Sequence, residues 1–245
     1  MTTPNKGRRE LPLVQLLPNM MTVAALCAGV TAIRMAITGR FDLAVGLIII
    51  AAIFDALDGR LARLLKSESE IGAELDSLCD FVNFGVAPGI ILYQWALLEM
   101  PRAGWIAALV YIVCALLRLA RFNIGNRSPE TPTLSHFVGV PSPAGAMLAL
   151  LPLFLAHMLE AKPIAPQLIA LWMIGVGAAM IGRFPTPSFK SATIYAEHVR
   201  FIVVGFVALV AALASYPWVT LVALDLVYLG IVAGNLLLGL RKPKP

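Results

Sequence analysis

Charged residues are scarce in this sequence: they make up 13% of its 245 residues, against about 25% in an average soluble domain. Hydrophobic residues account for 59%, and the mean hydropathy is +0.84. This composition excludes an ordinary soluble domain and predicts an integral membrane protein surrounded by membrane lipids. The net charge is +5, but no basic stretch stands clear of the apolar segments, so we expect no nucleic-acid partner.

Cysteine is rarer still. Cys27, Cys79 and Cys114 are odd in number, widely spaced and inside apolar segments. This pattern argues against a disulfide framework or a cysteine metal site, and favours small packing residues.

The apolar residues form segments long enough to cross a bilayer as helices, each of about 20 residues. We predict an all-α bundle with eight transmembrane helices at 17–38, 41–61, 73–98, 103–121, 136–158, 165–182, 199–216 and 218–239. Prolines in the third and fifth segments are expected to break those helices. Asp225 falls within the last segment without an evident local partner, so it either hydrogen-bonds a neighbouring helix or is protonated.

The basic residues predict the orientation of these spans. If both termini are cytoplasmic, all but four of the 19 Lys and Arg lie on the cytoplasmic side, as the positive-inside rule requires. The exceptions are Arg34, Arg40, Arg102 and Lys162. Residues 1–16 form a basic lead-in, and the apolar run after them is long enough to span, so we expect no signal-peptide cleavage.

Four of the few acidic residues lie close together at hydrophobic segments. Asp55 and Asp58 are three residues apart, and Asp76 and Asp80 are four apart, so each pair shares one helix face. A short polar connector, 66–70, brings the two helices together. We therefore predict that four carboxylates face one another at the cytoplasmic side.

Carboxylates gathered beside a bilayer repel one another unless they bind a cation. Oxygen ligands suit hard divalent ions, so we predict Mg²⁺ or Mn²⁺, as one or two ions. Gly59 directly follows Asp58, where a missing side chain lets a ligand approach the helix. Arg63 is placed to bind a phosphate in a bidentate manner.

The run reads Asp-x2-Asp-Gly-x2-Ala-Arg-x8-Gly-x3-Asp-x3-Asp. Its specified positions are Asp55, Asp58, Gly59, Ala62, Arg63, Gly72, Asp76 and Asp80. It resembles, at all of them, the signature of the CDP-alcohol phosphotransferase family. The resemblance implies a CDP-linked lipid donor, CMP as leaving group and a homodimer. It also implies that Asp80 is the general base, and that Asp55, Asp58 and Asp76, with Asp80, hold the metal.

The same resemblance implies that Gly59, Ala62, Arg63 and Gly72 contact the CDP-lipid. Asn19, at the cytoplasmic rim of the first span, either reaches this site or caps its helix. We divide the chain into a cytoplasmic or interfacial segment (1–16), a family core of six spans (17–190), and two additional spans with a basic tail (191–245).

Three stretches are similar to the bacterial phosphatidylserine synthases within the family: DSLCDFVNFGVAPG at 76–89, RLARFN at 118–123 and GVPSPA at 139–144. This similarity implies CDP-diacylglycerol and L-serine as substrates, and the inner membrane of a bacterium as the location. Acceptor or phosphate ligands are then expected among Arg118, Arg121, Asn123, Asn83, Arg183, Ser188 and Lys190. The arginines are equally well explained as anchors of the membrane topology.

Other functions remain open from the sequence. Within the family, the acceptor is alternatively glycerol 3-phosphate, choline or inositol phosphate. A cation-coupled transporter also places carboxylates in a helix bundle. Against a transporter, all four aspartates fall at one membrane face, and no inverted repeat is detectable.

Overall fold

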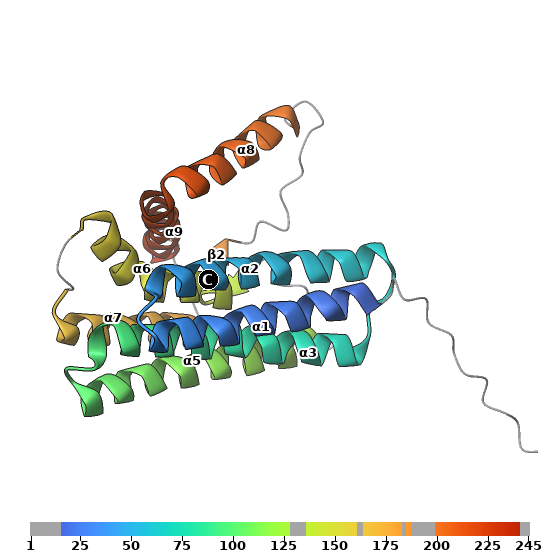
Figure 1. Cartoon of the computed structure of the whole chain (residues 1–245). Helices are drawn as coiled ribbons and strands as arrows, with labels where there is room; N and C mark the ends of the chain where they lie inside the picture. The colour runs from blue at the N-terminus through green and yellow to red at the C-terminus, as the bar shows by residue number, and fades with distance from the viewer. Residues whose placement is uncertain (1–15, 128–135, 161–163, 183–184, 188–198, 241–245) are drawn as a thin grey trace, which may run out of the picture.

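The computed structural model describes residues 16–127, 136–160, 164–182, 185–187 and 199–240. The chain is almost entirely helical (Figure 1). The helices are α1 (Leu17–Ile37), α2 (Phe41–Leu64), α3 (Glu70–Asp80), α4 (Ala87–Leu92), α5 (Pro101–Arg127), α6 (Ser142–Met158), α7 (Pro166–Ile181), α8 (Val199–Ser215) and α9 (Pro217–Leu240). Two π-helical segments, η2 (Phe81–Val86) and η3 (Tyr93–Leu97), join α3 and α4 into one helical stretch, 70–97.

The main bundle is built from helices packed side by side, antiparallel for α1 and α2 and parallel for α5 and α7. α1 packs along α2, α5 packs along α7, and the stretch from α3 to η2 lies against both α1 and α5 (Figure 1). Alanines such as Ala32, Ala36 and Ala44 are fully or nearly fully buried where α1 meets α2. Small side chains let helix backbones approach closely, which is how helices associate within a membrane.

The last two helices lie at the edge of this bundle. α8 packs against α9, and α9 packs against α6 and β2. Figure 1 shows α9 nearly along its own axis while α1, α2 and α5 run across the view, so α9 is not parallel to them. α9 therefore crosses the side of the bundle next to α6.

Several described helices have the length and composition to cross a membrane. Four qualify fully: Leu17–Ile37, Glu70–Leu97, Pro101–Gly125 and Pro217–Gly234; shorter apolar helices are Ser142–Met158, Pro166–Ile181 and Val203–Ser215. The chain is an integral membrane protein. Each of the eight predicted segments coincides with a helical stretch, but the number of eight crossings remains a prediction.

The fifth predicted segment, 136–158, is wrong at its start. Residues His136–Val138 form strand β1, which pairs antiparallel with strand β2 (Pro185–Pro187). Gly139 then adopts a φ of +80°, which is favourable only for glycine, and α6 begins at Ser142 after Pro141. The fourth segment was too short, because α5 continues to Arg127 and not 121.

The prolines do not end the helices in which they lie. Pro152 is inside α6, and Pro88 lies in α4 directly after the π-helical segment η2. Proline has no amide hydrogen to donate to the carbonyl one turn earlier, which for Pro88 is that of Phe84. The hydroxyl of the buried Tyr111 on α5 donates to the Phe84 oxygen at 2.8 Å. The freed carbonyl is thus satisfied within the membrane, as a buried backbone group requires.

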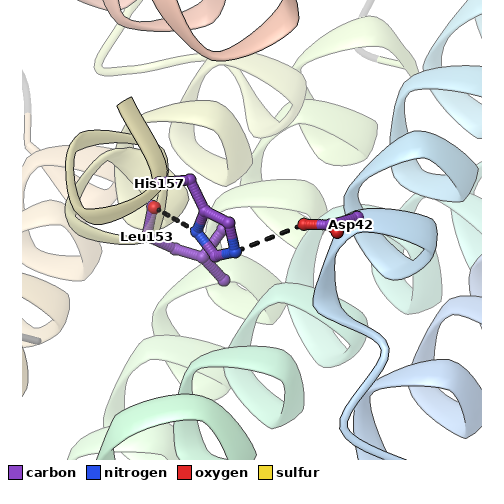
Figure 2. A network of polar contacts seen from close by, with 3 residues as sticks. All are labelled: Asp42, Leu153 and His157. Atoms are coloured by element: carbon purple, nitrogen blue, oxygen red, sulfur yellow. Dashed lines mark hydrogen bonds and ion pairs between the residues drawn. The ribbon is translucent and has the colours of Figure 1, made fainter. Parts of the chain in front are cut away.

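A polar contact joins helices at the end of the bundle opposite to the aspartates. His157 of α6 lies with Nε2 3.2 Å from Asp42 Oδ1 at the start of α2, and with Nδ1 2.9 Å from the Leu153 oxygen (Figure 2). Its ring also packs on Trp218 of α9, with the ring centroids 4.5 Å apart. One side chain therefore connects α2, α6 and α9.

Candidate active site

Three aspartates from α2 and α3 converge at a place where α1 packs against both helices. One carboxylate oxygen from each of Asp55, Asp76 and Asp80 lies within 4.8 Å of the others. All three side chains are half-buried. α2 supplies Asp55 near its C-terminal end, and α3 supplies the other two, one turn apart. The structure thus contains the predicted arrangement in which two helices present carboxylates to each other.

Asp58 lies outside that group of three. Its side chain is 4% exposed, and its Oδ2 accepts a hydrogen bond of 2.5 Å from the hydroxyl of Thr22 on α1. Sequence reasoning missed Thr22. The sequence offered only a weak indication of Thr22 as a site residue, because it is a threonine three residues after Asn19 at the cytoplasmic end of the first span. The metal-binding role of Asp58 remains a prediction.

A cavity of roughly 230 Å³ opens beside the aspartates. It is enclosed by the start of α1, the end of α2, the connector and the start of α3. Its lining residues are Pro18, Asn19, Thr22, Asp58, Gly59, Ala62, Arg63, Ser67, Glu68, Ser69, Gly72, Ala73 and Asp76. Asp76 belongs both to the group of three aspartates and to the cavity wall, so the two features form one continuous site.

The cavity brings together all the residues predicted to contact the CDP-lipid. Asn19 is inside α1, whose N-cap is Leu16 without a side-chain cap, so the alternative that Asn19 caps the helix is wrong. Its Oδ1 lies next to Gly72, where an added Cβ would be 3.0 Å from it. Ser69 caps α3 by accepting from the Gly72 amide at 3.0 Å, which fixes the connector at the cavity edge.

Arg118 lies near the end of α5. It is 8% exposed, and its Nη1 donates to Ser142 Oγ at 3.0 Å at the start of α6. Its guanidinium carbon lies 5.3 Å from the centre of the Phe122 ring. Its charge also interacts with that of Asp80. A buried guanidinium beside the aspartates is unlike a plain topology anchor, which would reach the membrane surface.

Two other predicted acceptor residues make contacts within the bundle. Nη1 and Nη2 of Arg121 donate to the carbonyls of Ile181 (2.8 Å) and Gly182 (3.3 Å) at the end of α7, where a helix leaves its carbonyls unpaired. The Asn123 amide donates to Ser77 Oγ on α3 at 3.1 Å. These contacts hold α5 to α7 and to α3, while the ligand-binding roles of both residues remain predictions.

Asn83 is 1% exposed, and its Oδ1 has no hydrogen-bond partner among the described residues. It follows Asp80 by three residues, within the π-helical segment η2. Gly29 of α1 packs directly on its amide, since a Cβ there would be 2.0 Å from Oδ1. Arg183, Ser188 and Lys190, also predicted, lie outside the described residues.

Known proteins resemble this chain along most of its length. The CDP-alcohol phosphatidyltransferase family matches residues 15–229. The chain belongs to this family. Relatives named CDP-diacylglycerol–serine O-phosphatidyltransferase include one from Mycobacterium leprae, 38% identical over 94% of this chain and 77% of the relative. Others are from Helicobacter pylori (35%; 71% of this chain, 73% of the relative) and Bacillus subtilis (34%; 71% and 91%).

CDP-alcohol phosphatidyltransferases generally use a divalent metal ion, and the donor set here suits one. Asp55, Asp76 and Asp80 offer only carboxylate oxygens, which hard divalent cations prefer. Three carboxylates this close repel one another, and a cation among them would turn that repulsion into attraction. The geometry of the group therefore fits the metal that the family uses.

Proposed function

We propose that this protein transfers the phosphatidyl group from CDP-diacylglycerol to the hydroxyl of L-serine, giving phosphatidylserine and CMP. The observation that carries the proposal is the site itself: three converging aspartates that share Asp76 with a cavity lined by the rest of the family signature. The relatives bearing the serine phosphatidyltransferase name support serine as the acceptor.

Asp55, Asp76 and Asp80, with Asp58 beside them, are the residues that would hold one or two Mg²⁺ or Mn²⁺ ions. A bound divalent ion offsets the charge of a diphosphate and stabilises the departing phosphate. Asp80 would act as general base. It takes the proton from the serine hydroxyl as the oxygen bonds to the lipid-side phosphorus, and the bond from that phosphorus to the CMP oxygen breaks.

The cavity would hold the CDP moiety. Asn19 and Arg63 offer an amide and a guanidinium to the nucleotide and its phosphates. Small or absent side chains at Gly59, Ala62 and Gly72 leave space in the cavity, so that the ligand can approach the backbone of α2 and α3. At Gly59 an added Cβ would meet nothing within 4 Å, so protein packing does not require glycine there.

Gly59→Ala therefore separates ligand fit from folding. We expect the melting temperature to stay the same or rise, because alanine favours a helix by about 1 kcal/mol over glycine. The KM for CDP-diacylglycerol should increase about tenfold or more, since the methyl group occupies ligand space. Gly46→Ala on the same helix is the matched control, since its Cβ also meets nothing within 4 Å. Equal CDP-diacylglycerol KM values in both variants would contradict this role of Gly59.

Arg118 would bind the serine carboxylate, and Asn83, Arg121 and Asn123 are further acceptor ligands in this proposal. Arg183, Ser188 and Lys190 belong to it on the sequence alone. The proposal places the site at the cytoplasmic face of a bacterial inner membrane, with both termini cytoplasmic and the protein as a homodimer. Residues 17–190 would form the catalytic core and 191–245 an addition to it.

The test measures which labelled acceptor is incorporated into the lipid product. Purified protein in detergent micelles receives CDP-diacylglycerol, Mg²⁺ or Mn²⁺, and isotope-labelled serine or glycerol 3-phosphate. Label from serine in phosphatidylserine supports the proposal. Label only from glycerol 3-phosphate would make the protein a phosphatidylglycerophosphate synthase. No labelled lipid with either acceptor would overturn the serine assignment, and cation-driven solute uptake by the protein in vesicles would then favour a transporter.

A further inference from the structure

Two buried polar groups on α9 have no role in the site described above. Asp225 is 4% exposed, and its Oδ2 has no hydrogen-bond partner in the part of the chain that the structure describes. The hydroxyl oxygen of Tyr228 is likewise buried and without a partner there. Buried polar atoms are nearly always paired, because an unpaired one keeps the full cost of leaving water. Each atom therefore calls for a partner.

Tyr228 lies near Arg118, one of the residues expected to bind the acceptor. Its hydroxyl is close enough to Arg118 for the two groups to interact electrostatically, and Arg118 interacts in turn with Asp80. α9 packs against α6, the helix whose Ser142 accepts from Arg118. α9 therefore brings the Tyr228 hydroxyl toward Arg118.

The hydrogen-bond donors of Arg118 and Tyr228 suit a carboxylate. The guanidinium of Arg118 has five N–H groups, and its hydrogen bond to Ser142 uses one of them. The Tyr228 hydroxyl has a hydrogen to donate and no acceptor among the described residues. A carboxylate between the two would satisfy both groups with charge-assisted hydrogen bonds.

Asp225 supplies the opposite charge. It precedes Tyr228 by three residues, so the two side chains share one face of α9, with Cβ atoms about 5–6 Å apart. An ionised aspartate buried among apolar residues needs a cation. An ammonium group carried by the same ligand as the carboxylate would meet this need.

We propose that α9 completes the acceptor subsite: Tyr228, together with Arg118, binds the carboxylate of the amino-acid acceptor, and Asp225 binds its ammonium group. This inference rests on the proposed function and extends it beyond the aspartates and the six-helix core. It also gives a reason for acceptor choice. Asp225 attracts the ammonium of a zwitterion such as serine and repels a phosphorylated acceptor, which carries only negative charge.

The experiment compares Tyr228→Phe and Asp225→Asn with the wild type. KM and kcat are measured for serine and for CDP-diacylglycerol, with the melting temperature of each protein. Tyr216→Phe, the same change at an exposed position just before α9, is the control. Rates are also taken with ethanolamine, which lacks the carboxylate, and with 3-hydroxypropionate, which lacks the ammonium.

We expect Tyr228→Phe to raise the serine KM about tenfold or more, the effect of losing a hydrogen bond to a charged group, and to leave ethanolamine rates unchanged. Asp225→Asn should raise the serine KM. It should also lower the ratio of kcat/KM for serine to kcat/KM for 3-hydroxypropionate. In both variants the CDP-diacylglycerol KM and the melting temperature should stay near those of the wild type and of Tyr216→Phe.

Unchanged serine KM values would overturn the inference. So would equal increases in both KM values with a lower melting temperature, because these would mark a purely structural role for α9. If the wild type itself fails to use serine, the proposed function fails. If it uses serine and the variants match it, only the assignment of α9 fails.

Discussion

Replacing Asp80 by Asn is expected to lower the rate of CMP release by roughly 100- to 10,000-fold, the usual contribution of a general base. Asparagine keeps the shape and one oxygen of the side chain but cannot take the proton of the attacking hydroxyl. Asp55 and Asp76 remain to hold the metal, and the cavity, of which Asp80 is not a lining residue, is unchanged. CDP-diacylglycerol should therefore still bind, with a dissociation constant within a few-fold of that of the wild type.

The measurement pairs single-turnover CMP release with equilibrium binding of CDP-diacylglycerol. Asp42→Asn is the matched control: Asp42 lies at the opposite end of α2, 74% exposed and paired with His157 (Figure 2), and its loss should leave the rate near that of the wild type. An Asp80→Asn enzyme with wild-type turnover would remove Asp80 as the base. Loss of CDP-diacylglycerol binding with loss of activity would instead make Asp80 chiefly a metal ligand.

Arg118→Ala is expected to lower kcat/KM for serine by roughly 10- to 150-fold, the range for losing a hydrogen bond between charged groups. The loss should appear mainly as a higher serine KM, because the guanidinium binds the acceptor before any bond changes. Arg118→Lys should recover only part of it, since lysine keeps the charge but lacks the planar fork that matches a carboxylate.

Steady-state kinetics with serine and CDP-diacylglycerol varied in turn provide the check. Arg121→Ala is the informative companion, because Arg121 holds the end of α7 through two carbonyls. A lower melting temperature with an unchanged serine KM would assign Arg121 to the fold, while a raised serine KM would make it an acceptor ligand. An Arg118→Ala enzyme with wild-type serine kinetics would reduce Arg118 to a structural residue.

The parts of the site that the sequence predicted are those governed by local geometry. Spacing along a helix decides which residues share a face, so Asp76 and Asp80 could be paired from the sequence. The serine before α3 could be expected as its cap. The connector between α2 and α3 is short, so the approach of Asp55 to the other two aspartates also followed.

The parts that it missed depend on contacts between residues far apart in the chain. Thr22 and Asp58 are separated by 36 positions, and no local pattern records that α1 brings them together. The pairing of β1 with β2 depends in the same way on the start of α6 lying beside the end of α7. Asp225 was noticed as a buried acid without a partner, but its relation to Tyr228 and Arg118 depends on where α9 packs.

The dependence of CMP release on a divalent metal tests the role of the aspartates most directly. Purified protein is freed of divalent ions with a chelator and assayed with CDP-diacylglycerol and serine, before and after Mg²⁺ or Mn²⁺ is restored. CMP release should vanish with the chelator and return with the metal, and Asp76→Asn should need a higher metal concentration for half-maximal rate. Full CMP release in the metal-free protein, or an Asp76→Asn enzyme with an unchanged metal requirement, would contradict the claim that these aspartates form the catalytic metal site.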